Sequence, residues 1–158
     1  MNLQKLYAIQ MDLDKRIIEK HGLQGKSTLE EKKLALYVEL GELANETRCF
    51  KFWSTKEPSA KEVILEEYVD CLHFFLSIGI EKEWLITPQE IESPNSIIKC
   101  FNHLFDNLYF VTNSLLSHKT IFEHFISLGK LLGFSWEEVE QAYLEKNLVN
   151  HERQVNGY

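Results

Sequence analysis

The sequence predicts an all-α protein built as a bundle of about five to six helices. Three observations indicate this class. Apolar residues recur at helical spacing along most of the chain, capping patterns precede several of these segments, and only 7 glycines and 3 prolines occur in 158 residues. So few turn-forming residues leave little room for an all-β fold. With 44% hydrophobic residues, the chain can bury a core as a single domain covering residues 1–158.

Three helices are expected in the first half of the chain. Apolar residues at helical spacing predict the first of them, which a pair of glycines ends. Capping boxes of the type Ser/Thr-x-x-Glu begin at Ser27, Thr28 and Ser59, and they start the second and third helices. An aromatic stretch between those two helices breaks the period and is expected to be a loop. These elements are the helices 3–20, 28–48 and 59–79 and the loop 49–58.

Three more helices are expected in the second half. Two prolines fall in a connection without helical period. The next segment keeps the period for long enough to be interpreted as one helix. The fifth helix ends at Gly133, and a capping box that begins at Ser135 starts the last one. These elements are the connection 81–95 and the helices 96–117, 120–132 and 135–150.

Composition excludes several classes of protein. The formal net charge of −7 argues against non-specific binding to nucleic acid, which needs basic surface. The sequence lacks both the roughly 18 consecutive apolar residues of a membrane span and a signal peptide, so we expect a cytoplasmic protein. Its three cysteines, Cys49, Cys71 and Cys100, have no CxxC spacing, so we expect neither a structural zinc site nor a disulfide framework.

Two pairs of acidic residues stand out because apolar residues surround them. Glu39 and Glu42 lie at i, i+3 spacing in the second helix, as Glu67 and Asp70 do in the third, so each pair shares one helical face. Carboxylates buried on such faces are costly unless cations pair with them. Clustered carboxylates suit a hard divalent ion such as Mg²⁺. The sequence therefore predicts a metal site formed by these four acids.

Other interpretations of the charged residues stay open. The acids could line a water-filled groove or face bases from another helix, and Glu46 and Glu66 could replace one of the named ligands. Near the C-terminus, Lys146, Asn150 and Arg153 recur on one helical face, which suits a triphosphate because arginine clamps anions well. The alternative is an ordinary basic helix end, which the helix dipole favours.

Glu39-x-x-Glu42 followed by Glu67-x-x-Asp70 resembles the metal motif of the all-α nucleoside-triphosphate pyrophosphohydrolases. Further stretches resemble the dimeric dUTPase branch of that superfamily, in which some members carry Asn where this chain has Asp14. The matches cover most of the chain except about residues 80–135. They are Ile9-Gln10-x-x-Leu13-Asp14, Phe52-Trp53-Ser54, Asp70-x-x-His73-Phe74 and Tyr143-x-x-Lys146-Asn147-x-x-Asn150-x-x-Arg153-Gln154-x-x-Gly157-Tyr158.

The resemblance implies a homodimeric dUTPase-like domain that hydrolyses dUTP, and also dUDP, to dUMP. Two or three Mg²⁺ ions would be bound by the four acids, and Glu42 would be the general base. The residues implied for phosphate binding are Lys146, Asn150, Arg153 and Tyr158. Those implied around the deoxyuridine are Gln10, Trp53, His73, Phe74 and Asn147.

Three of the nucleoside-binding assignments have a simpler competitor. Phe74 could be a core residue, His73 a buried histidine with protein partners, and Trp53 a packing residue. Gln10 lies on the apolar side of the first helix, where its amide needs partners that a uracil edge would supply. Two other functions also remain open. One is a MazG-like pyrophosphohydrolase acting on another nucleotide such as dCTP. The other is a non-catalytic helical regulatory protein, and an enzyme could itself bind a protein regulator.

Overall fold

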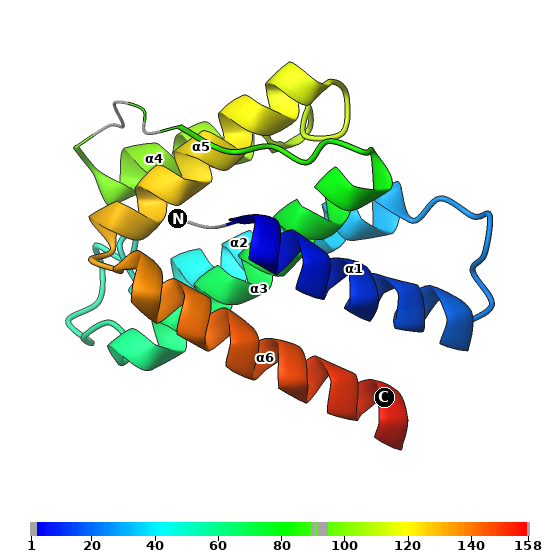
Figure 1. Ribbon diagram of the computed structural model, residues 1–158. Coiled ribbons are helices and arrows are strands. Elements are labelled where there is room, and N and C mark those ends of the chain that lie inside the picture. Colours follow the sequence, from blue (N-terminus) through cyan, green and yellow to red (C-terminus); the bar gives the residue numbers. More distant parts are fainter. Residues whose placement is uncertain (1–2, 90, 92–94, 158) are drawn as a thin grey trace.

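The computed structural model describes residues 3–89, 91 and 95–157, and every regular element within these ranges is a helix (Figure 1). The predicted all-α class and helix-bundle architecture are therefore confirmed. The connections that were expected at about residues 21–27, 49–58 and 81–95 fall between helices, as predicted, with bounds that differ by one or two residues. The helices are α1 (Leu3–Lys20), α2 (Leu29–Thr47), α3 (Lys61–Glu81), α4 (Ile97–Leu108), α5 (Leu115–Leu131) and α6 (Trp136–Asn156).

Helix α3 lies at the centre of the bundle and contacts α1, α2, α5 and α6. It takes this place because its sequence is apolar on nearly every side, and such a helix is stable only when other helices surround it. In contrast to a surface helix, it buries consecutive residues throughout its second half. The residues of α3 that are buried in this way are Tyr68, Val69, Cys71, Leu72, Phe75, Leu76 and Ile78.

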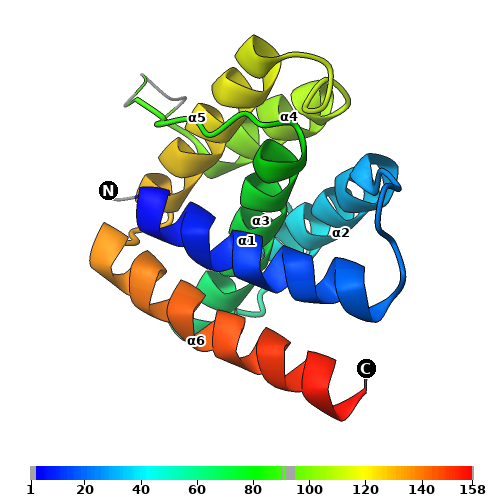
Figure 2. The ribbon, with the colours of Figure 1, turned by 45° about the vertical axis from the view of Figure 1, so that its right-hand side comes forward.

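Helices α1 and α6 lie side by side and run in the same direction in front of α3 (Figures 1 and 2). An ion pair at one end and a hydrogen bond at the other fix this arrangement. Lys5 Nζ lies 2.5 Å from the carboxylate of Glu140 near the start of the two helices, and Lys20 donates to the carbonyl of Gln154 near their ends. The first and last helices of the described chain therefore form one layer that covers the central helix.

The fourth and fifth helices differ from the prediction. A single helix over 96–117 was expected, but α4 ends at Leu108 and α5 begins at Leu115. Ser114 forms the N-cap of α5, because its hydroxyl accepts a hydrogen bond from the backbone N–H of Ser117. The apolar period continues through this turn because the side chain of Val111 is buried there, so periodicity alone did not reveal the break.

The predicted capping boxes are only partly confirmed. The box at Ser135 forms, with both reciprocal bonds to Glu138 present. Those at Ser27 and Thr28 do not, because both hydroxyls donate instead to Glu81 at the end of α3. Helix α3 also begins without a side-chain cap, since the Ser59 hydroxyl donates to Glu46 of α2, and α6 extends to Asn156, beyond the expected end at 150. The hydroxyls of Ser27, Thr28 and Ser59 therefore connect one helix to another.

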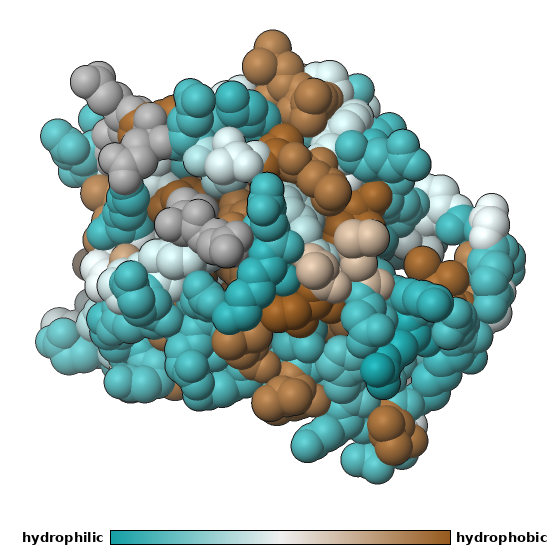
Figure 3. Space-filling view, in the orientation of Figure 1, coloured by the Kyte–Doolittle hydropathy of each residue, from teal (hydrophilic) through white to brown (hydrophobic). Residues whose placement is uncertain are grey.

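The surface is largely polar where α1 and α6 lie. Figure 3 shows this face as mostly hydrophilic, with apolar side chains in separate patches, one of them at the top of the view over the connection between α4 and α5. Within the described part of the chain, no helix combines the length and the apolar character that crossing a bilayer requires.

Helix α5 approaches α3 closely where Gly129 faces Tyr68. The ring of Tyr68 is buried and stacks on Phe125 with 4.3 Å between ring centroids. Gly129 makes room for its hydroxyl end, because a Cβ atom at this position would lie 2.6 Å from the Tyr68 oxygen. A real side chain cannot approach so closely without moving the buried ring.

We expect Gly129→Ala to destabilise the protein by about 1–3 kcal/mol, because the methyl group overpacks the contact between α3 and α5. The measurement is the free energy of unfolding from urea denaturation. Gly41→Ala is the matched control, since nothing lies within 4 Å of a Cβ atom there. It should stabilise α2 by up to about 1 kcal/mol through helix propensity. Equal effects of the two substitutions would contradict the packing argument.

Candidate active site

Three carboxylates from adjacent helices form a compact acidic cluster. Glu39 projects from α2, and Glu67 and Asp70 project from α3, with one oxygen of each within 4.8 Å of the others. All three side chains are half-buried. The pairing of α2 with α3 and the i, i+3 spacing on α3 bring them together, as the sequence predicted for these three residues.

Burial and mutual repulsion perturb the cluster strongly. Burial raises the pKa of Glu39 to about 7, and the negative charges of Asp70 and Glu42 add to the rise. Burial likewise raises the pKa of Glu67 to about 7, with Asp70 and Glu42 contributing again. Such carboxyl groups favour any state in which a cation lies among them. The cluster therefore has the donor atoms and the electrostatics of a divalent-metal site.

Lys146 of α6 supplies one positive charge at the edge of this cluster. Its Nζ donates to Asp70 Oδ2 at 2.6 Å and to Glu66 Oε1 at 2.8 Å. Burial opposes the charged form of this lysine, but the two carboxylates outweigh that effect and raise its pKa. The sequence left open that the acids face a basic residue of another helix. This is the arrangement of Asp70 and Glu66, which both face Lys146.

Glu42 differs from its expected position. It was predicted on the apolar side of α2 with the other acids, but its side chain is exposed and lies outside the cluster of Glu39, Glu67 and Asp70. It is still near enough for its charge to raise the pKa of both Glu39 and Glu67. Glu46, an alternative ligand, instead accepts the hydroxyl hydrogen of Ser59.

A cavity of about 480 Å³ lies beside the acidic cluster, between α1, α2, α3 and α6. Its volume falls within the range of small-molecule sites. Carboxylates, cations and amides line it together with apolar side chains, so it can take a ligand with both a charged and a flat apolar part. The lining residues include Gln10, Leu13, Asp14, Ile17, Lys32, Ala35, Glu39, Asp70, His73, Phe74, Ser77, Lys146, Asn150, Arg153 and Gln154.

The structure gathers most, but not all, of the predicted binding residues at this cavity. Of the phosphate set, Lys146, Asn150 and Arg153 line it, and Tyr158 lies outside the described residues. Of the nucleoside set, Gln10, His73 and Phe74 line it. The other two differ: Trp53 is 65% exposed in the loop after α2, and Asn147 is buried but does not line the cavity.

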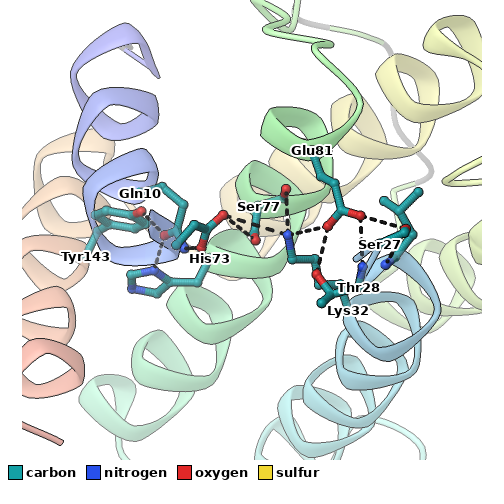
Figure 4. A network of polar contacts seen from close by, with 10 residues as sticks. Gln10, Ser27, Thr28, Lys32, His73, Ser77, Glu81 and Tyr143 are labelled. Atoms are coloured by element: carbon teal, nitrogen blue, oxygen red, sulfur yellow. Dashed lines mark hydrogen bonds and ion pairs between the residues drawn. The ribbon is translucent and has the colours of Figure 1, made fainter. Parts of the chain in front are cut away.

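A buried hydrogen-bond network forms one wall of the cavity (Figure 4). Gln10 is at its centre. The amide Nε2 of Gln10 donates to Asp14 Oδ1 at 2.8 Å, and its Oε1 accepts from the hydroxyl of Tyr143 at 2.5 Å. His73 Nδ1 lies 2.7 Å from the same Oε1, and the imidazole stacks on the Tyr143 ring. The buried amide of Gln10 therefore has partners within the protein, where the sequence analysis expected a uracil edge to supply them.

The network continues to the junction of α2 and α3. Ser77 donates to Asp14 Oδ2 at 2.6 Å, and Lys32 Nζ lies 3.9 Å from that oxygen and 2.7 Å from Glu81. Burial favours the neutral form of Glu81, but hydrogen bonds from Lys32, Ser27 and Thr28 outweigh it and lower the pKa to about 2. Glu81 therefore joins the end of α3 to the start of α2.

Sequence reasoning did not assign Asp14, Lys32 or Ser77 to the site. Asp14 could have been found, because it lies one helical turn after Gln10 and shares its face. Lys32 precedes Glu39 by two turns on the same face of α2. Ser77 carried no signal, since a single serine in an apolar helix has many possible partners.

The fold and the site together define an all-α protein with a carboxylate cluster beside a cavity of nucleotide size. A family model described as dUTPase matches residues 2–158, which is nearly the whole chain. The chain belongs to this family, the all-α dUTPases, and its activity is that of a dUTP diphosphatase. A comparison with curated proteins found no match.

We expect Glu81→Gln to lower the free energy of unfolding by about 1–2 kcal/mol at pH 7, because it weakens charge-assisted hydrogen bonds between α2 and α3. The folded-state pKa of Glu81 is about 2 against an ordinary 4.5. Its contribution is therefore complete above pH 4.5 and is lost as the pH falls toward 2. Urea denaturation of wild type and variant at several pH values measures the difference, which should shrink on acidification.

Glu19→Gln is the control for this pH dependence, because Glu19 forms only an exposed ion pair, 3.9 Å from Lys15. Its effect should be close to zero at every pH. A Glu81→Gln deficit that persists unchanged at low pH would show that the lost stability does not come from the ionised carboxylate.

Proposed function

We propose that this dUTP diphosphatase requires Mg²⁺ and hydrolyses both dUTP and dUDP to dUMP at the cavity beside the acidic cluster. One observation carries the proposal: Glu39, Glu67 and Asp70 present carboxylate oxygens within 4.8 Å of one another beside a cavity that Lys146 and Arg153 line. The acids would coordinate a metal ion, and the cations would bind phosphate. We propose that residues 1–158 form the single domain that does this.

The donor set of the cluster fits Mg²⁺. All three groups offer carboxylate oxygen, which hard cations prefer, and burial together with neighbouring negative charge raises the pKa values of Glu39 and Glu67. We propose that these residues and Glu42 together bind two or three ions. When bound, Mg²⁺ neutralises charge on phosphate oxygens and lowers the pKa of a coordinated water.

Helix α6 is proposed to bind the phosphate chain. Lys146, Asn150 and Arg153 lie one turn apart along it and all line the cavity. Lys146 would exchange Asp70 and Glu66 for phosphate oxygens, and the guanidinium of Arg153 can bind two oxygens at once. Tyr158 is proposed to join them. These groups would hold the phosphate groups that become pyrophosphate and stabilise the charge that develops during hydrolysis.

Glu42 is proposed as the general base. Its exposed side chain at the margin of the cluster is open to a water molecule, and its charge acts on both Glu39 and Glu67. A carboxylate in this position can accept the proton of the water that attacks phosphorus, and such assistance contributes roughly 10²–10⁴-fold to a rate.

The wall formed by α1 and α3 is proposed to bind the deoxyuridine. Gln10 and His73 offer polar atoms to a base edge, and Phe74, half-buried in the same wall, offers an aromatic surface for stacking. Trp53 and Asn147 are proposed to join the nucleoside site when ligand binds. Asn147 has a buried Nδ2 without a hydrogen-bond partner among the described residues, which supports a polar role.

A homodimer is proposed because apolar side chains of the isolated chain remain in solvent. Leu34 and Val38 are exposed on α2, and Tyr109 and Phe110 are exposed after α4. The ammonium of Lys33 lies 5.4 Å from the Tyr109 ring, so these two groups are neighbours. A second copy would remove them from water. We further propose a cytoplasmic enzyme acting on free nucleotides, because a net charge of −7 disfavours nucleic acid as a partner.

We expect purified protein with Mg²⁺ to convert dUTP to dUMP and pyrophosphate, and dUDP to dUMP and phosphate, both measured by chromatography of the products. Glu42→Gln should lower kcat by about 10²-fold or more while the circular dichroism spectrum stays unchanged. Glu30→Gln is the matched control, because Glu30 is an exposed residue of α2 paired with Lys33. It should keep full activity.

Two outcomes would contradict the proposed function in different ways. If dUTP is inert and dCTP or another nucleotide is hydrolysed, the proposed base is wrong although the all-α pyrophosphohydrolase chemistry stands. If Mg²⁺ binds and no nucleotide is hydrolysed, the chain is a non-catalytic helical protein with a structural metal. Full activity of Glu42→Gln would remove that residue from the mechanism.

We expect Lys146→Met to bind Mg²⁺ about threefold or more tightly in the absence of nucleotide, because the ammonium that now neutralises Asp70 is gone. The same variant should bind dUTP more weakly, since a phosphate contact is lost. Isothermal titration with Mg²⁺ alone measures the first effect. Lys61→Met, which removes an exposed partner of Glu138, is the control and should leave Mg²⁺ affinity unchanged. Weaker Mg²⁺ binding by Lys146→Met would contradict competition between lysine and metal.

A further inference from the structure

The orientation of the Gln10 amide is set by Asp14. An ionised carboxylate only accepts hydrogen bonds, so the NH₂ end of Gln10 must face Asp14 Oδ1, 2.8 Å away. The carbonyl end then faces the hydroxyl of Tyr143 and Nδ1 of His73, at 2.5 and 2.7 Å. Reversing the amide would leave two acceptors, the Asp14 carboxylate and the Gln10 oxygen, facing each other.

This orientation also selects the tautomer of His73. Because Gln10 Oε1 can only accept, the proton of the imidazole must be on Nδ1, and Nε2 carries the lone pair. Burial lowers the pKa of His73 to about 3, with the charge of Lys146 adding to the effect, so the ring is neutral. Nε2 is buried and has no hydrogen-bond partner among the described residues.

Asp14 is itself held from its other side. Ser77 donates to its Oδ2 at 2.6 Å, and Lys32 Nζ lies 3.9 Å from that oxygen. Lys32 is anchored in turn by Glu81 at 2.7 Å. Asp14 is buried, and burial raises the pKa of its carboxyl, while Ser77, Lys32 and Gln10 offset that rise. Helices α2 and α3 thus hold the carboxylate against the amide on α1.

Gln10 and His73, which both line the cavity, keep one donor and one acceptor that no described residue uses. The donor is the second amide hydrogen of Gln10, for which no bond is formed among the described residues, and the acceptor is Nε2 of His73. Uracil presents the complementary pair on one edge, a carbonyl oxygen at C4 and a hydrogen on N3. Cytosine presents the opposite pair, an amino group at C4 and a lone pair on N3. A site whose polar groups face the wrong partners rejects a ligand strongly.

We propose that Asp14 is a positioning residue that sets the order of donor and acceptor on this wall and thereby makes the site select uracil over cytosine. The inference rests on the proposed function, because it requires the base to bind against Gln10 and His73. Asp14 acts only through those two side chains, from one turn further along α1.

The test compares Asp14→Leu, Asp14→Asn and the control Asp12→Leu, which changes an exposed acid of the same helix. Asp14→Leu removes the acceptor at similar size. Its ratio of kcat/KM for dUTP over dCTP should fall by about tenfold or more, chiefly through a higher KM for dUTP. Asp14→Asn can still turn an oxygen toward Gln10 and its amide toward Ser77, so it should retain most of the discrimination. Asp12→Leu should equal wild type.

A spectroscopic measurement reads the proposed role without any substrate. Nitrogen-15 NMR of the histidine rings should show His73 as the Nδ1–H tautomer in wild type and Asp14→Asn, and as a mixture of tautomers in Asp14→Leu. An unchanged tautomer and unchanged discrimination in Asp14→Leu would overturn the inference. If that variant does not fold, Ser77→Ala provides the same test. We expect it to lose less discrimination than Asp14→Leu, and a Ser77→Ala variant with unchanged discrimination would overturn the inference.

These measurements separate the inference from the proposed function. If wild type hydrolyses dUTP and dCTP equally well, the proposed base specificity fails, whatever the NMR spectra show. If wild type discriminates and Asp14→Leu discriminates equally well, the base specificity stands and the positioning role of Asp14 falls.

Discussion

Glu39, Glu67 and Asp70 bring three acidic groups together between two packed helices, and the rest of the architecture is arranged around the need to balance them. Helix α3 must be central, because its apolar residues face every neighbour, yet it also carries two of these acids. Lys146 of α6 balances part of this negative charge by donating to Asp70. A last helix bearing cations therefore has an electrostatic reason to lie along the central one, in addition to the apolar area that it covers.

The two sides of the cavity have different physical characters. On the acidic side, charges are incompletely balanced and the carboxyl pKa values of Glu39 and Glu67 are high, so that side gains when a cation arrives. On the opposite wall, Gln10, Tyr143 and Asp14 already satisfy one another, so that wall is rigid before any ligand binds. The first kind of surface provides binding energy, and the second provides selectivity, because only a fixed wall can reject the wrong shape or polarity.

The sequence predicted the helix bundle because apolar periodicity reports burial directly, and it predicted Glu39, Glu67 and Asp70 because acids on an apolar face require an explanation. It expected Glu42 on the same apolar face, but Glu39 is half-buried and Glu42, one turn further on, is exposed. Trp53 lies in a loop, where periodicity carries no information. Ser27, Thr28 and Ser59 were expected to accept hydrogen bonds from backbone N–H groups of their own helices, but their hydroxyls donate to carboxylates of other helices, which are strong acceptors.

The bond between Tyr143 and Gln10 joins residues 133 positions apart, whereas the acids of α2 and α3 come from helices that follow each other in the chain. Closing a long loop costs more entropy than closing a short one, so contacts of this kind form late in folding. The acidic side of the cavity and the wall formed by Gln10 and Tyr143 therefore differ in the sequence separation of their contacts as well as in their chemistry. The acidic cluster requires only that α2 and α3 pair, whereas the wall that faces the base requires α1 and α6 to dock as well, so a disturbance that loosens α1 or α6 removes the discrimination between bases before it removes the binding of cations.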